Sequence, residues 1–162
     1  MTSLQPSSQP HTFVLRSGIS PLAEEMGRLA NSLAEKGAAC QNSVEQETYY
    51  RCAVSRAYYS AFHHAREYAA QKLNFNKKGY HTGGQSHARL IQHLKTQFDI
   101  MLPDEAPKMS NYLQQAKSAR ENADYDDELK LKKLPRTGDQ ETIGEFYERF
   151  LKLVNTVIST MC

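Results

Sequence analysis

The sequence predicts an all-α protein, an antiparallel up-down bundle of about five helices. Apolar residues recur at helical spacing in several segments, and no segment alternates polar and apolar residues as a strand does. From Val44 to Leu73 the chain contains neither Gly nor Pro, which predicts one long helix. A chain of 162 residues is long enough for one domain with one hydrophobic core. We expect a flexible arm over residues 1–17 and a single helical domain over residues 18–162.

The first helix is predicted from Pro21 to Lys36, with Ser20 as its cap and Gly37 as its stop. One face of this helix is expected to pack against the rest of the bundle, because four large apolar residues recur there at helical spacing. These residues are Leu22, Met26, Leu29 and Leu33. The second helix is predicted from Val44 to Leu73, capped by Ser43.

Three further helices follow, from about Ser86 to Met101, from about Pro107 to Asp124, and from about Glu141 to Met161. Residues 74–85 are rich in glycine and polar residues and are expected to form a mobile loop; residues 125–140 are expected to form an exposed connector. The last helix carries a continuous apolar face: Ile143, Phe146, Tyr147, Phe150, Leu151, Val154, Val157 and Ile158.

Composition excludes several classes of function. The net charge of +2 is too small to indicate by itself that the protein binds nucleic acid. No apolar run of eighteen residues and no signal-peptide pattern is present, so we expect no membrane partner. Three cysteines without a CxxC spacing argue against a disulfide framework and a zinc site, and indicate a reducing cytoplasm. Five of the six histidines lie in the helical domain, and none of the six stands in the Glu-x-x-His step of metal-binding bundles, so we expect no metal and no cofactor.

The informative stretch lies in the second helix, from Tyr49 to Tyr68. One side of this helix is small and apolar and is predicted to face the core: Val54, Ala57, Tyr58, Ala61, Ala65, Tyr68 and Ala69. On the opposite side, four polar side chains fall within about 60° of one another and are expected to form an outward stripe. They are Arg56, Ser60, His63 and Glu67, with His64 on the flank. Such a stripe is more often a solvated surface than a catalytic site.

The string SRAYYSAFHHA resembles the central helix of HEPN domains, whose signature is an Arg and a His separated by four to six residues. Six residues separate Arg56 from His63. A second HEPN-like signature is SARENADY, which contains Arg120, Asp124 and Tyr125 and which we expect to be structural. SHARL, from Ser86 to Leu90, falls where similar proteins carry a Ser-His step. The similarity covers Pro21 to Met161.

The resemblance implies a metal-independent endoribonuclease that acts as a toxin or effector in a prokaryotic toxin–antitoxin or anti-phage (antiviral) defence system. RNA carries its own nucleophile, the 2′-hydroxyl, so cleavage needs a base, an acid and positive charge on the phosphate. Arg56 and His63 would be catalytic, in a composite site at a homodimer interface, because they start about 10 Å apart along one helix axis. An antitoxin or controlling subunit is implied as a partner, besides RNA. Substrate-binding roles are expected for Tyr59, Ser60, His64, Glu67, Lys77 and Lys78.

The alternative is a non-catalytic HEPN adaptor that docks a nucleotidyltransferase or a larger defence complex. Catalytic members usually have a polar residue directly after the motif Arg, whereas this chain has Ala57. Members that are modified by a nucleotidyltransferase carry a Tyr two positions after the His, and here that position is Ala65. Ala57 favours the adaptor, while the spacing of Arg56 and His63 favours the nuclease.

Overall fold

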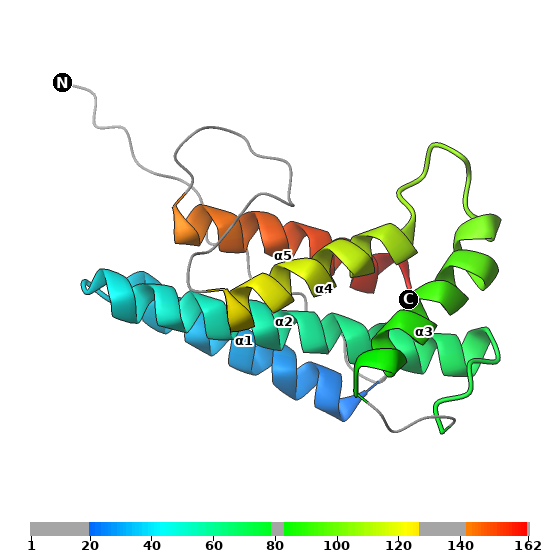
Figure 1. Ribbon diagram of the computed structural model, residues 1–162, viewed down its shortest axis with the longest axis horizontal. Helices are drawn as coiled ribbons and strands as arrows, with labels where there is room; N and C mark the ends of the chain where they lie inside the picture. The colour runs from blue at the N-terminus through cyan, green and yellow to red at the C-terminus, as the bar shows by residue number, and fades with distance from the viewer. Residues whose placement is uncertain (1–19, 79–82, 127–141, 162) are drawn as a thin grey trace.

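The computed structural model describes residues 20–78, 83–126 and 142–161. Within these ranges it consists of five α-helices and one 3-10 turn, with no strand (Figure 1), so the predicted all-α class is confirmed. The arm predicted over residues 1–17 and most of the connector predicted over residues 125–140 lie outside the described residues. None of the described helices combines the length and the apolar character that crossing a bilayer demands.

The first two helices form a close antiparallel hairpin. Helix α1 (Pro21–Ala39) starts as predicted, since the Ser20 side chain accepts a hydrogen bond from the backbone N–H of Ala23. Gly37 does not stop α1; it lies inside the helix, where an added Cβ would meet ring carbons of Tyr50 at 3.1 Å. Helix α2 (Ser43–Lys72) is capped by Asn42 rather than by Ser43.

The remaining elements are α3 (Gly83–Gln97), the short turn η1 (Asp99–Met101), α4 (Met109–Tyr125) and α5 (Ile143–Thr160). The third predicted helix is therefore divided, because α3 ends before Phe98. Thr142 and Glu145 form a reciprocal capping box at the start of α5. The predicted face of α5 is confirmed: all of its residues are buried except Ile143, which packs against the core from its edge.

The packing face predicted for α1 is wrong for Leu22 and Leu29, whereas Leu33 is partly buried against the core. Leu22 and Leu29 are 47% and 43% exposed, and Met26 and Leu33 are half-buried. A neighbouring stripe of small residues is buried instead: Ala23, Gly27, Ala30 and Gly37. Small side chains allow two helix backbones to approach closely, and the contact between α1 and α2 uses them in this way. Leu22 and Leu29 are therefore left at the surface, while Met26 and Leu33 are half-buried; we call these four residues the α1 stripe.

The core side predicted for α2 is confirmed at six of its seven positions, which are buried, while Tyr68 is half-buried. In the ribbon, α1 and α4 run in one direction while α2 and α5 run in the other (Figure 1). The step from α2 to α3 breaks the expected up-down order. His87 of α3 lies against Phe62 and His93 of α3 contacts Leu73, so α3 advances in the same sense as α2.

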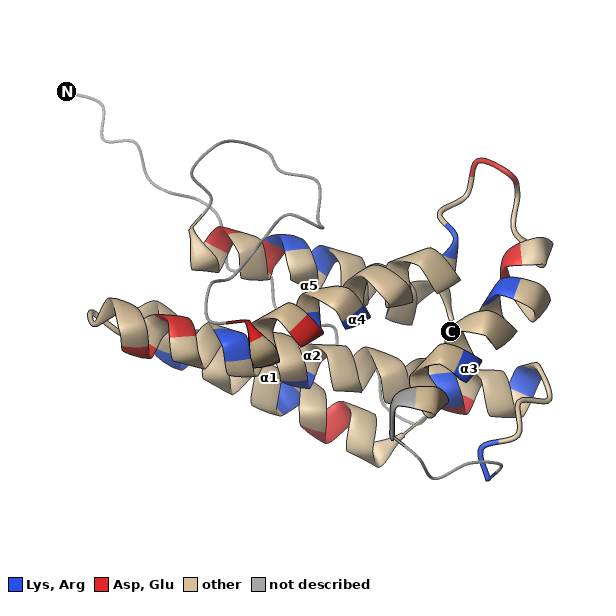
Figure 2. Cartoon of the chain, in the orientation of Figure 1, with Lys and Arg blue, Asp and Glu red and all other residues tan. Residues whose placement is uncertain are grey.

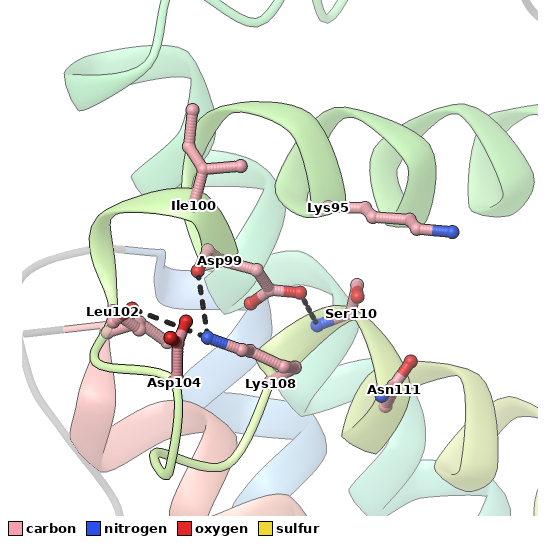
Figure 3. Close-up of a pocket in the computed structure, with 8 residues that line it drawn as sticks. All are labelled: Lys95, Asp99, Ile100, Leu102, Asp104, Lys108, Ser110 and Asn111. Atoms are coloured by element: carbon pink, nitrogen blue, oxygen red, sulfur yellow. Dashed lines mark hydrogen bonds between the residues drawn. The ribbon is translucent and has the colours of Figure 1, made fainter.

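The corner between α3 and α4 is held by two charged side chains (Figure 3). The buried carboxylate of Asp99 accepts hydrogen bonds from the backbone N–H groups of Met109 and Ser110, and so caps α4 from ten residues away. The ammonium of Lys108 donates to three backbone carbonyl oxygens, those of Asp99, Leu102 and Pro103, at 3.0 to 3.3 Å. This corner fixes where α4 begins, and therefore where its polar residues lie along α2.

Candidate functional site

A pocket of about 330 Å³ opens where α2, α3 and α4 meet. Three helices contribute its walls: Tyr58 and Tyr59 come from α2, His87 from α3, and Lys117, Arg120, Glu121 and Tyr125 from α4. We call this pocket the α2–α4 cleft. The helices contact one another here through the ends of long side chains, such as Tyr58 with His87 and Tyr59 with Arg120. The space between the helix backbones is therefore only partly filled.

Arg120 occupies the centre of the cleft. Its Nη2 donates a hydrogen bond to the hydroxyl oxygen of Tyr59 at 2.5 Å, and its Nε lies 3.2 Å from a carboxylate oxygen of Asp124. The guanidinium carbon is 5.1 Å from the centroid of the Tyr59 ring and 6.0 Å from that of Tyr125, which are cation–π distances. Arg120 and Asp124 therefore form an ion pair one helical turn apart, and Arg120 also lines the cleft.

His87 lies on the opposite wall. Its Nδ1 is joined to the hydroxyl of Tyr58 by a hydrogen bond of 2.6 Å, and its ring lies 4.1 Å from that of Phe62. Burial, together with the positive charges of Arg120 and Lys117, lowers the pKa of His87 to about 4. The imidazole is therefore neutral at physiological pH.

His63 lies at the edge of the cleft. The side chain is half-buried, and its ring stacks on that of Tyr59 at 6.4 Å between centroids. Burial lowers the pKa of His63, and so does Arg66, while Glu67 acts in the opposite direction. The charge of protonated His63 also helps to lower the pKa of His87, which means that the two imidazoles interact electrostatically. His63 is thus unprotonated near neutral pH and open to solvent in part.

The expected outward stripe of α2 is wrong for Ser60. Its side chain is 2% exposed and donates a hydrogen bond to the backbone carbonyl of Ala23 in α1. Arg56 is half-buried, and its Nη1 lies 3.9 Å from the sulfur of Met26. Because the small residues of α1 let that helix cover this side of α2, the side chains of Arg56 and Ser60 contact α1 while His63 contacts the rings beside the cleft. The helix between Arg56 and His63 is unbroken.

The other predicted binding residues are distributed over several environments. His64 is 3% exposed, so in this arrangement a bound molecule does not reach it. Glu67 forms an ion pair of 2.7 Å with Lys77, from the segment after α2, rather than a bond with His63. Lys78 is exposed. Of the predicted substrate-binding side chains, Tyr59 is the one that lines the cleft.

Two residues that shape the cleft, Arg51 and His87, were given no role in the predictions from sequence. The Arg51 guanidinium donates to the carbonyl oxygens of Ala123 and Asp126, so it holds the C-terminal end of α4 against α2. His87 was noted within SHARL and given no role, although it forms a wall of the cleft. Arg51 also pairs with Glu47 one turn earlier, but its carbonyl partners on α4 lie about seventy residues away in the chain, so the sequence does not show that it holds α4.

No cluster of three metal-ligating side chains occurs among the residues that the structure describes. Comparison of the chain with protein-family models, with curated proteins and with solved structures gave no match.

Proposed function

We propose that this chain is a metal-independent endoribonuclease, acting in the cytoplasm as a toxin or effector of a prokaryotic toxin–antitoxin or anti-phage defence system. The observation that carries the proposal is the cluster around Tyr59, where one half-exposed imidazole and one guanidinium meet a phenol. His63 stacks on the ring of Tyr59, and Arg120 donates to its hydroxyl oxygen. An antitoxin or a controlling subunit would restrain the free enzyme.

The cluster supplies the three elements that RNA cleavage needs. His63 is unprotonated near neutral pH, so it can take the proton of the 2′-hydroxyl as that oxygen attacks the phosphorus. Arg120 supplies positive charge for the crowded phosphate. Because the Tyr59 oxygen accepts its hydrogen bond from Arg120, the phenolic proton is available for the 5′-oxygen as the P–O5′ bond breaks. The products are a 2′,3′-cyclic phosphate and a free 5′-hydroxyl.

The predicted homodimer belongs to the same proposal, and the α1 stripe supports it. Leu22 and Leu29 are large apolar residues that a monomer exposes, and Met26 of the same stripe contacts Arg56. A second copy seated on this stripe would bury the leucines and bring the predicted Arg56 close to the subunit boundary. In sedimentation equilibrium, Leu29→Glu should dissociate the dimer, while Val44→Glu, at a more exposed apolar site outside the α1 stripe, should not. A wild-type monomer would contradict the dimer.

The nuclease is tested by incubating the purified chain with total RNA in EDTA. We expect cleavage that falls by about a hundredfold or more in His63→Ala and in Tyr59→Phe, and strongly in Arg120→Lys and Arg56→Ala. His93→Ala is the matched control, because His93 bonds to Leu73 on the far side of α3 and should leave cleavage unchanged. Cleavage that persists in His63→Ala would refute the assignment of the base.

The second candidate is the non-catalytic HEPN adaptor that docks a nucleotidyltransferase or a larger defence complex. The arrangement of charge favours it, since acidic and basic positions are interspersed along the helices in the view of Figure 2. Its Arg120 is also already paired with Asp124. Absence of RNA cleavage by the wild-type chain would favour the adaptor.

A further inference from the structure

The dimensions of the α2–α4 cleft suit a single nucleotide rather than a helix or a metal ion. At about 330 Å³, the cleft lies at the small end of the range for small-molecule sites. Three of its seven lining residues are tyrosines, and a guanidinium lies among their rings. Tyrosine and arginine planes are the surfaces on which proteins stack unpaired bases.

Tyr125 is the lining residue with the most unused surface. It is the last residue of α4, and it is 76% exposed although the cleft is beside it. Arg51 fixes the end of α4 through the carbonyl groups of Ala123 and Asp126, so the backbone on both sides of Tyr125 is held. A ring on a fixed backbone is a stacking surface that needs little further ordering when a base binds.

Beside Glu121, the charges of the cleft favour the edge of a base over a phosphate. Lys117 is paired with Glu121 at 2.5 Å and Arg120 with Asp124 at 3.2 Å, so each cation already has a carboxylate partner. An anion beside Glu121 would be repelled by its carboxylate, whereas the edge of a base can donate hydrogen bonds to it. Glu121 lines the cleft and its side chain is 42% exposed, so its second oxygen is accessible.

We infer that the α2–α4 cleft binds one unstacked base of single-stranded RNA, with Tyr125 stacking on its face and Glu121 accepting from its edge. Guanine offers two adjacent N–H donors on its Watson–Crick edge, and the accessible oxygen of Glu121 has two lone pairs that can accept from them; the other bases offer fewer such donors. Guanine is therefore the preferred occupant. The inference takes its polymer, RNA, from the proposed function, and it adds the base that is recognised beside the scissile phosphate.

The test uses binding rather than cleavage. Labelled 2′-O-methyl hexamers lack the nucleophile, so they cannot be cut; four such hexamers, uridine except for one varied central base, are titrated with the full chain and followed by anisotropy. We expect the guanine hexamer to bind about tenfold more tightly than the uridine hexamer. Tyr125→Ala should weaken binding of the guanine hexamer by about tenfold, and Tyr125→Phe should restore it. Glu121→Gln should abolish the preference for guanine while stacking remains.

Gln114→Ala, at an exposed position of α4 that does not line the cleft, is the matched control and should bind as the wild type does. Equal binding of the four hexamers, or binding that Tyr125→Ala leaves unchanged, would overturn the inference, and so would the absence of binding by the wild type. Hexamer binding as expected in a chain that cuts no RNA would leave the base site standing and remove the nuclease. Cleavage by the wild type with no guanine preference in the hexamers would keep the nuclease and remove the base site.

Discussion

The two sides of α2 form contacts of opposite kinds. Toward α1, the contact is made by small residues and backbone: Gly37 lies under the ring of Tyr50, and Ser60 reaches the carbonyl of Ala23. Toward α3 and α4, the contact is made by the tips of long side chains, such as Tyr58 on His87 and Tyr59 on Arg120. The first side leaves no room between the helices, and the second leaves a cleft.

The difference shows how one helix can serve stability and binding together. Close approach of backbones excludes water and fixes the position of α2 against α1. Bridging by side-chain tips leaves polar atoms at a surface where a ligand can replace or extend their hydrogen bonds. The proposed chemistry therefore lies on the side of α2 that is packed less tightly, and the tightly packed side supports it.

The strongest test of this contrast is Ala30→Leu. Ala30 is fully buried in the contact with α2, so three added carbon atoms must push the helices apart. We expect the free energy of unfolding to fall by about 1 to 3 kcal/mol in urea titrations. Leu29→Ala, one residue away on the exposed α1 stripe, should change it by less than about 0.5 kcal/mol in the monomer. Equal losses in the two variants would remove the distinction between the buried and exposed faces of α1.

A smaller effect is expected on the other side of α2. Tyr58→Phe removes the hydroxyl that bonds to Nδ1 of His87 while keeping the ring that fills the core. The cost should be about 1 kcal/mol, because one hydrogen bond is lost and no cavity forms. Urea titration measures it, and Tyr112→Phe, at a half-buried position of α4, is the control. If Tyr58→Phe lowered the free energy of unfolding as much as Ala30→Leu does, the two sides of α2 would be equally sensitive to substitution.

The smallest effect concerns pH. In the folded chain the pKa of His87 is about 4, below its ordinary value of 6.5, because of burial and the charges of Arg120 and Lys117. Protonation therefore favours the unfolded chain. The stabilisation is complete above about pH 6.5 and is lost as pH falls through about 4. Since the side chain is only half-buried, we expect a loss of no more than about 1 kcal/mol. His87→Gln should reduce this pH dependence, and an unchanged slope would contradict it.

The sequence predicted the helices well and their buried faces less evenly. Caps and breaks are local, so Ser20 and the start of α1 could be located from neighbouring residues alone. The buried face of α1 was mispredicted because it depends on how α1 packs against α2. The face with small side chains allows the closer approach of the two helices, so this face is buried rather than the face with the leucines. Ala23, Gly27 and Ala30 also recur at helical spacing, and this pattern could have predicted the buried face of α1.

The residues of the candidate site likewise fall into those that the sequence could predict and those that it could not. His63 and Tyr59 could be selected from their positions on one helix, and they do lie together. Ser60 could not be excluded, because the stripe on which it was placed depends on what covers that side of α2. The roles of His87 and Arg51 depend on partners that are distant in the chain. The local patterns that contain them, SHARL and the pair of Arg51 with Glu47, therefore do not reveal those roles.

The corner held by Lys108 has a consequence for the ionic surroundings of the protein. Three carbonyl oxygens converging on one cation resemble the shell that a protein builds for potassium or sodium, and here the chain supplies the cation itself. A tethered charge cannot be chelated or exchanged. The junction that sets α4, and with it the cleft, is therefore insulated from changes in salt composition that would empty a true ion site.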